Sequence, residues 1–251
     1  MSELAAWPVM AGRSLRLTLR NIDGLLITLL LPVMIMLLFV YLFGGAIDTG
    51  TTEYVTYALP GVLIICASYG ASMTAVSVAD DMSKGVVDRF RSMDIGARAL
   101  LSGHVAASTL RNLCSVVAVF AVAFLIGFRP AAGPAGWLAT AGVLIAFIVA
   151  MSAISATVGL LARTPEAASG FTFFVLFLPY PSSAFVPVDT MPGWLHGFAR
   201  NQPATPVIET VRGLLLDQPV GTRPWVALAW CAGILLVAGA FAGVLFRRRT
   251  R

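Results

Sequence analysis

Few residues in this chain have the types and spacing that a metal site, a disulfide framework or a catalytic site requires. The three cysteines, Cys66, Cys114 and Cys231, lie in or beside apolar runs and form no CxxC or Cys/His spacing. They predict neither a metal site nor a disulfide framework, so we interpret them as packing residues. His104 and His196 fall on opposite sides of the predicted membrane spans and cannot share a site. Surface or interfacial positions are expected for both histidines.

Nucleotide hydrolysis and ion-coupled transport also lack the residues they need. A phosphate-binding loop requires a Gly-Lys pair whose lysine reaches the phosphates, but the sole lysine, Lys84, follows Ser83. No Ser/His/Asp or HExxH pattern occurs, and no carboxylate or histidine lies at the centre of a predicted span, where an ion-coupled carrier usually needs one. An enzyme is therefore not expected, no cofactor is expected in this chain, and a stand-alone secondary carrier is disfavoured.

One long polar segment, residues 79–104, could dock a partner. Apolar residues at helical spacing form one stripe on it: Met82, Val86, Phe90 and Met93. Opposite charges lie three or four residues apart on its other faces: Asp80/Lys84, Lys84/Asp88, Asp88/Arg91 and Asp94/Arg98. Gly96 breaks the pattern, and a second helix is predicted from Ala97. The segment is either a docking surface or a solvated helix lying on lipid headgroups.

The elements that position this segment are membrane spans. Of the 251 residues, 58% are hydrophobic and 12% are charged, whereas a soluble domain carries about 25% charged residues. The sequence predicts an all-α integral membrane protein with six transmembrane helices, each of roughly the 17–25 residues that crossing requires. The predicted spans are 24–45, 57–79, 112–128, 137–162, 167–186 and 225–246.

The distribution of basic residues predicts the orientation of these spans. With the N-terminus inside, 13 of the 17 basic residues are cytoplasmic: Arg13, Arg16, Arg20, Lys84, Arg89, Arg91, Arg98, Arg111, Arg163, Arg247, Arg248, Arg249 and Arg251. The four on the other side are Arg129, Arg200, Arg212 and Arg223. Both termini are therefore expected in the cytoplasm, with Arg111 at the cytoplasmic end of the third span. This bias accounts for the net charge of +5, so nucleic acid is not expected as a partner.

Two flanking regions carry shorter helices. Residues 4–22 have an apolar face opposite Arg13, Arg16 and Arg20, which is typical of a helix lying in the membrane interface. The alternative is a basic flank that only orients the first span. Outside the membrane, residues 187–224 predict short helices at 193–200 and 205–216. These either dip back against the membrane or form a plain external cap.

Small residues recur at two places where helices could approach closely. One is the pattern from Gly239 to Gly243 in the last span, and the other is Ser152, Ser155 and Gly159 in the fourth. Either pattern could serve packing within one subunit or dimerisation.

Two stretches of the sequence resemble a known family over essentially the whole chain. One is ADDMSKGVVDRFRSM at 79–93, and the other is FVPVDTMPGWL at 185–195, followed by NQPATP at 201–206 and VRGLL at 211–215. Together they are similar to the ABC type-2 exporter permeases, especially the daunorubicin-resistance type of actinobacteria. Asp94 stands where that family often has proline, so the hinge between the two cytoplasmic helices is expected to differ.

The resemblance implies a half-transporter in the plasma membrane. It would pair with a second permease, most simply a copy of itself, and with two separate ATPase subunits that hold ATP and magnesium. The 80–104 loop would couple to the ATPase through Asp81, Val86, Asp88, Arg89, Phe90, Arg91 and Met93. The 4–22 helix would be the family's connecting helix, through Arg13, Arg16 and Arg20. Family substrates include hydrophobic drugs, antibiotics, lipids and glycans.

A substrate cavity is expected between the permease halves. The candidate lining residues are Ser68, Tyr69, Ser72, Met73, Phe171, Phe173, Phe174 and Phe177. Lipid-facing or packing positions are the alternative for all eight. Besides a drug exporter, the sequence leaves open an exporter of lipid-linked glycans, a stand-alone carrier and a non-transporting scaffold.

Overall fold

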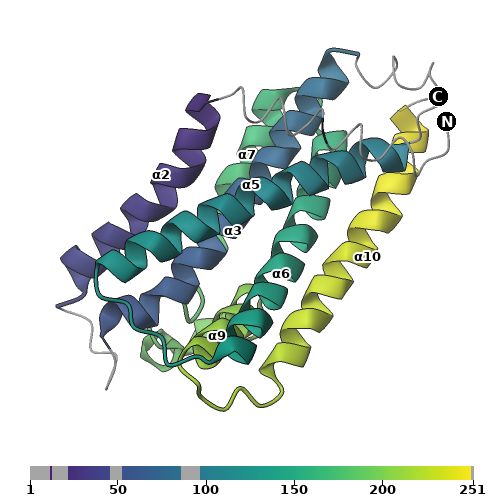
Figure 1. The fold of residues 1–251 in the computed structure, drawn as a ribbon. Coiled ribbons are helices and arrows are strands. Elements are labelled where there is room, and N and C mark those ends of the chain that lie inside the picture. Colours follow the sequence, from purple (N-terminus) through teal and green to yellow (C-terminus); the bar gives the residue numbers. More distant parts are fainter. Residues whose placement is uncertain (1–11, 13–21, 46–52, 86–96, 250–251) are drawn as a thin grey trace.

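The regular secondary structure of the described part of the chain is entirely helical. A computed structural model describes residue 12 and residues 22–45, 53–85 and 97–249, and these ranges contain no strand. The predicted all-α class is confirmed for them. In chain order the helices are α2 (Ile22–Leu38), the π-helix η1 (Phe39–Phe43), α3 (Tyr54–Ser83), α5 (Ala97–Leu125), α6 (Pro134–Leu161), α7 (Pro165–Phe177), the 3-10 helix η2 (Val188–Thr190), α8 (Gly193–Asn201), α9 (Ala204–Leu215) and α10 (Arg223–Arg249) (Figure 1).

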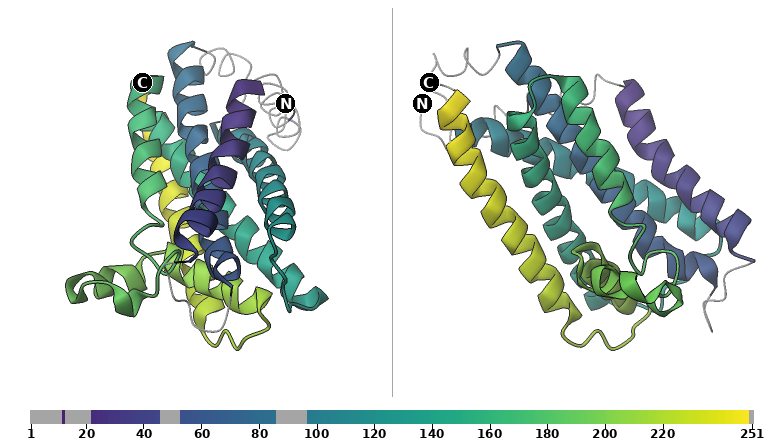
Figure 2. Two further views of the ribbon diagram at one scale, coloured as in Figure 1. Left: turned by 90° about the vertical axis from the view of Figure 1, so that its left-hand side faces the viewer. Right: turned by 180° about the vertical axis from the view of Figure 1, so that it is seen from behind.

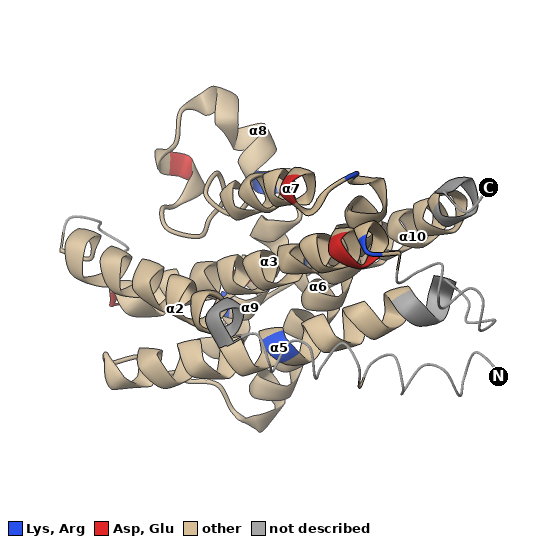
Figure 3. Cartoon of the chain, turned by 90° about the horizontal axis from the view of Figure 1, so that it is seen from above, with Lys and Arg blue, Asp and Glu red and all other residues tan. Residues whose placement is uncertain are grey.

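Five stretches of the described chain are long and apolar enough to cross a membrane: Leu26–Phe43, Tyr54–Ser83, Leu101–Leu125, Pro134–Leu161 and Arg223–Leu245. Helices α3, α6 and α10 run in one direction along the bundle, and α2 and α5 run in the other (Figures 1 and 2). The ends of α3 and α6 and the start of α5 therefore lie together at what we call the loop end. Helices α8 and α9 lie at the opposite, cap end (Figure 2). Charged residues are sparse along the bundle (Figure 3), as the cost of charge in hydrocarbon requires.

Helix α7 is shorter than the predicted fifth span. Thr164 caps its start by accepting a hydrogen bond from the Ala167 amide at 3.2 Å. The helix ends at Phe177, because Pro179 and Pro181 cannot supply the amide hydrogens that a continuing helix needs. Thirteen residues give a helix only about 20 Å long, against a hydrocarbon core of about 30 Å. The predicted fifth span, 167–186, is therefore helical only in its first part.

Helix α3 is the central element, packed against α2, α5, α6, α7 and α9. Small residues let its neighbours approach. A Cβ on Gly61 would lie 2.6 Å from the Ala184 Cβ, and one on Gly159 of α6 would lie 2.5 Å from the Ala75 carbonyl oxygen. Gly159 therefore serves packing within this subunit, one of the two roles left open by the sequence.

The corresponding pattern in α10 behaves differently. A Cβ on Gly239 or Gly243 would meet no other described atom within 4 Å. An added side chain at either glycine would therefore enter open space rather than a facing helix. Both glycines line a groove instead.

The end of α3 changes the interpretation of the polar segment. The helix runs past the predicted boundary at residue 79 to Ser83, and it stops where Gly85 takes a φ of 65°. Glycine adopts this left-handed backbone without the steric cost that a Cβ would add. Of the predicted stripe, only Met82 lies within the described residues, in the last turn of α3. The rest of the stripe, 86–93, lies outside the described residues, as does the predicted interfacial helix apart from Gly12 and Ile22.

Candidate functional site

The predicted ATPase-coupling residues meet the described structure at the loop end. Asp81, in the last turn of α3, is the one member of the set within the described ranges. It is 7% exposed, so its carboxylate is packed among the described helices rather than turned to solvent. The other predicted contacts lie outside the described residues: Val86, Asp88, Arg89, Phe90, Arg91, Met93 and the connecting-helix residues Arg13, Arg16 and Arg20.

Asp81 pairs with a histidine across the loop. His104 Nε2 lies 3.1 Å from Asp81 Oδ2, and His104 is itself 7% exposed. The expected surface or interfacial position is therefore wrong for His104, because α5 already begins at Ala97 and packs His104 against α3. His196 is partly buried on α8, with its Nε2 2.8 Å from the Met191 carbonyl oxygen. The Asp81–His104 pair joins the helices on either side of the 84–96 segment and so fixes the distance between its two ends.

Arg111 lies within a long apolar helix rather than at its end. Helix α5 covers Ala97–Leu125, and its stretch Leu101–Leu125 is long and apolar enough to cross a membrane, so the helix extends 15 residues before the predicted start of the third span at residue 112. The Arg111 Nη2 donates a hydrogen bond to the Gly70 carbonyl oxygen at 3.1 Å. This contact with α3 offsets part of the cost of a charge in hydrocarbon. An arginine keeps its proton in proteins, so Arg111 cannot act as the proton relay that a carrier would need.

A buried polar layer lies beside Arg111. The Ser108 and Ser152 hydroxyl oxygens are 2.9 Å apart, and the Asn112 Nδ2 donates to the Ser108 carbonyl at 3.0 Å. All three side chains are at most 1% exposed. Gly70 faces this layer, where a Cβ would lie 2.0 Å from the Asn112 Oδ1. The Ser108–Ser152 hydrogen bond ties α5 to α6, and the glycine lets α3 close over the layer.

The predicted cavity residues of α3 divide between two environments. Ser68 and Ser72 are fully buried, and the Ser72 hydroxyl donates to the Tyr69 carbonyl at 2.7 Å within the same helix. Tyr69 and Met73 are partly buried. For the two serines, packing is the better interpretation within this chain.

The predicted cavity residues of α7 face outward instead. Phe173, Phe174 and Phe177 are 66%, 67% and 50% exposed. Phe171 packs against the edge of the main core. None of the eight predicted lining residues lines either of the two cavities described below. Within one subunit they do not form a single lining, and the phenylalanines present an apolar face that another molecule must cover.

The cap end contains a cluster that the sequence reasoning missed. The Arg212 Nη2 donates to the Tyr57 carbonyl at 3.0 Å and to the Ser183 carbonyl at 2.6 Å, and its guanidinium carbon lies 3.9 Å from the centre of the Tyr57 ring. Burial, which removes water from the charged form, lowers the pKa of Arg212 from its ordinary value. Nearby, Glu209 and Arg223 pair at 3.0 Å on the wall of a polar cavity of about 460 Å³. The charge of Arg212 within an otherwise apolar helical stripe was the available signal.

Replacing Arg212 should loosen the cap. Arg212→Met keeps the length of the side chain but leaves the Tyr57 and Ser183 carbonyls without this donor. We expect a loss of about 2 kcal/mol in the free energy of unfolding, the usual cost of stranding buried polar groups. The measurement is denaturant unfolding of the purified protein in detergent.

Arg200→Met is the matched control, because Arg200 is 58% exposed and pairs with the exposed Asp189. Such surface pairs contribute about 1 kcal/mol or less. Equal losses for the two variants would show that Arg212 is not a structural clamp.

Within the described residues, no group of three or more His, Cys, Asp or Glu side chains could hold a metal ion. The groups brought together at both ends of the bundle are buried charges paired with polar atoms of neighbouring helices. Such groups fix helix positions, and this suits a chain that transmits motion.

Comparison with known proteins is consistent with this architecture. The ABC-2 type transporter family matches residues 6–216. The daunorubicin resistance ABC transporter permease protein DrrB1 of Streptomyces coeruleorubidus is 32% identical over 221 residues, covering 88% of this chain and 78% of that protein. The probable doxorubicin resistance permease DrrC of Mycobacterium tuberculosis is 23% identical over 88% of this chain and 80% of its own length. The chain belongs to the ABC-2 type transporter family, as a homologue of the daunorubicin and doxorubicin resistance permeases.

Proposed function

We propose that this chain is the membrane-spanning permease subunit of an ATP-binding-cassette exporter in the plasma membrane. It would move a hydrophobic or amphipathic, drug-like substrate out of the cell, driven by a separate ATPase that holds ATP and magnesium. The observation that carries the proposal is the family match over residues 6–216 together with similarity to permeases named for drug resistance. The absence of a Gly-Lys phosphate loop from the sequence agrees with a separate motor.

The charge distribution supports a cytoplasmic loop end. Once Arg111 is assigned to the middle of a span, 12 of the original 13 basic residues remain on the proposed cytoplasmic side, against four on the other. Lys84 and Arg163 lie beside the loop-end termini of α3 and α6. Arg129, Arg200, Arg212 and Arg223 belong to the loops and helices of the cap end. The excess of basic residues follows the positive-inside rule.

The proposed coupling runs through the 84–96 segment. ATP binding would close the two ATPases, push on Phe90 and its neighbours, and move α3 and α5 as rigid bodies. The Asp81–His104 pair supports this route, because it links the two helices that precede and follow the segment in the chain. Nucleotide must bind the two transporter states with different affinity, since only a differential affinity can shift the equilibrium between them.

A second permease copy would complete the transporter. The exposed Phe173, Phe174 and Phe177 face on α7 supports such a contact, since α7 packs beside α3 and leaves these rings uncovered. In this arrangement α7 would be a short sixth crossing, continued through the turns of 178–187. A substrate path would then lie between the copies rather than within one.

Substitutions in the proposed coupling segment test the function. Phe90→Asp combined with Met93→Asp should weaken ATPase binding by more than about tenfold, because a lost interface anchor costs about 2 kcal/mol or more. Co-purification of the ATPase and doxorubicin efflux from intact cells should fall together, while membrane insertion stays unchanged.

Trp194→Asp is the matched control. It places the same acid on an aromatic residue that is 83% exposed at the cap end, away from the proposed ATPase contact, and it should leave co-purification intact. Unchanged efflux in the loop variant, or efflux from vesicles that contain no ATPase, would refute the proposed function.

A further inference from the structure

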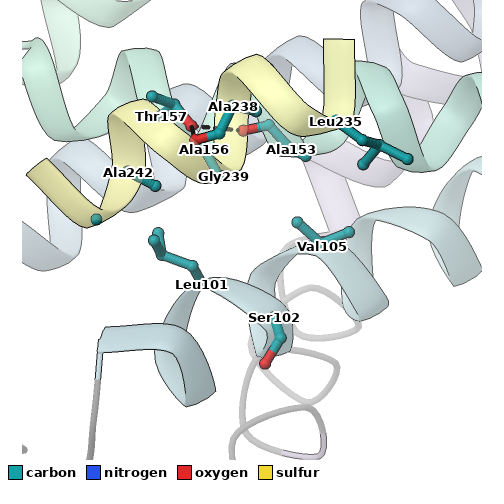
Figure 4. Close-up of a pocket in the computed structure, with 11 residues that line it drawn as sticks. Leu101, Ser102, Val105, Ala153, Ala156, Thr157, Leu235, Ala238, Gly239 and Ala242 are labelled. Atoms are coloured by element: carbon teal, nitrogen blue, oxygen red, sulfur yellow. Dashed lines mark hydrogen bonds between the residues drawn. The ribbon is translucent and has the colours of Figure 1, made fainter. Parts of the chain in front are cut away.

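A groove at the loop end is not used by the proposed coupling route. It lies between α5, α6 and α10 and has a volume of about 360 Å³, within the size range of small-molecule sites. Figure 4 shows Leu101 and Val105 of α5 facing Gly239 and Ala242 of α10 across it. Its lining is almost entirely aliphatic.

The groove exists because α10 contacts α6 closely and leaves α5 apart. The Thr157 hydroxyl of α6 donates to the Ala238 carbonyl of α10 at 3.2 Å, which fixes one wall. On the side facing α5, Gly239 and Gly243 add no side chain, and a Cβ on either would meet no described atom within 4 Å. Leu101 forms part of the opposite wall. The result is a concave apolar slot in the side of the bundle.

The surroundings of the groove identify the class of its occupant. Only 11% of the apolar window of α10 is buried, so this helix faces hydrocarbon and the groove is reached from the lipid side. Helix α10 then continues to Arg247, Arg248 and Arg249, which begin about 6 Å past Gly243 along the axis. Arg163, exposed just after α6, adds a cation at the same end. An apolar slot beside a helix whose next turn carries three arginines matches an acyl chain joined to an anionic headgroup.

We propose that this groove binds an anionic phospholipid. One acyl chain lies in the slot between α5 and α10, and the phosphate lies at the loop end near the arginines. The bound lipid would hold α5, which carries His104, apart from α10, and its release would let the two helices approach each other. The proposal requires only that the bundle lies in a membrane and needs neither the ATPase nor an identified substrate.

Native mass spectrometry of the detergent-purified full chain tests the proposal. The probes are phosphatidylglycerol and phosphatidylcholine with identical acyl chains, and we expect the wild-type chain to retain phosphatidylglycerol about tenfold more tightly. Gly239→Leu should abolish that preference by filling the slot. Gly233→Leu is the matched control, since Gly233 lies on the same helix, has equally open space around its Cβ and does not line the groove.

A second variant covers the case in which Gly239→Leu fails to fold. The triple change R247Q, R248Q and R249Q leaves the groove intact and should remove the preference for the anionic headgroup. Equal retention of both lipids by the wild type, or undiminished phosphatidylglycerol binding in Gly239→Leu, would overturn the proposal. So would lipid binding that appears only after residues 1–21 are deleted, or a Gly239→Leu variant that changes oligomeric state and not lipid retention. In those cases the occupant is the N-terminal segment or a second copy.

The outcome is separable from that of the proposed function. Lipid retention can be positive when ATPase co-purification fails, and the reverse also holds. The two measurements share no variant and no partner.

Discussion

Gly159→Ala should separate α3 from α6 and destabilise the protein by about 3 kcal/mol, the upper part of the range for overpacked cores. The added Cβ would lie 2.5 Å from the Ala75 carbonyl oxygen and 2.8 Å from the Val78 Cβ. Neither atom is the end of a flexible side chain, so one helix backbone must move. Because α3 and α6 share the most extensive helix contact in the described bundle, that displacement spreads along the core. Thermal and denaturant unfolding in detergent measure the loss.

Gly142→Ala is the control on the same helix. Gly142 is exposed, and a Cβ there meets nothing within 4 Å. This variant should be neutral or should gain up to about 1 kcal/mol from the better helix propensity of alanine. A Gly159→Ala variant as stable as Gly142→Ala would mean that α3 and α6 do not pack at this distance in the membrane.

The contrast between Gly159 and Gly239 shows what a sequence pattern can and cannot establish. Both lie in small-residue patterns on long apolar helices. One faces the backbone of α3, and the other faces an open groove. The difference depends on which helix lies opposite, and the periodicity of a single helix does not carry that information.

The spans themselves were more predictable, because a helix in hydrocarbon must satisfy its backbone internally and so leaves a long apolar run. The short external helices could also be located, since α8 (Gly193–Asn201) and α9 (Ala204–Leu215) coincide within a residue or so with the predicted 193–200 and 205–216. The apolar window and the helix differ where polar residues lie within a helix. Arg111 ended the apolar window from sequence, yet its Gly70 partner is 41 positions away and lets the helix continue.

The same limit applied to the loop end. Asp81 and His104 are 23 positions apart in two polar stretches, and nothing in their local sequence indicates that they would be buried together. From sequence they appeared as one docking residue and one surface histidine. The helix start at Ala97 was predicted, but the packing of His104 in that helix against α3 is a tertiary contact that its local sequence does not show.

Breaking the Asp81–His104 pair should cost about 3 kcal/mol, since removing one member of a buried pair leaves the other without its partner in a poorly solvated place. The test variant is Asp81→Ala. Both side chains are at most 10% exposed, and their polar atoms are 3.1 Å apart. If the pair also holds the ends of the coupling segment, ATPase co-purification should fall in this variant even though Phe90 and Met93 are unchanged.

Asp80→Ala is the control for Asp81→Ala: it removes the same carboxylate from an exposed position. Asp80 is the adjacent residue on the same helix and pairs with Lys84 at 2.7 Å, but these side chains are 41% and 65% exposed, so the expected loss is below about 1 kcal/mol. The double variant, Asp81→Ala with His104→Ala, completes a double-mutant cycle with the two single variants. Its loss should be smaller than the sum of the two single losses, because each single change already abolishes the shared contact. Strict additivity would show that the two residues act independently, and α3 and α5 would then need another link beneath the loop.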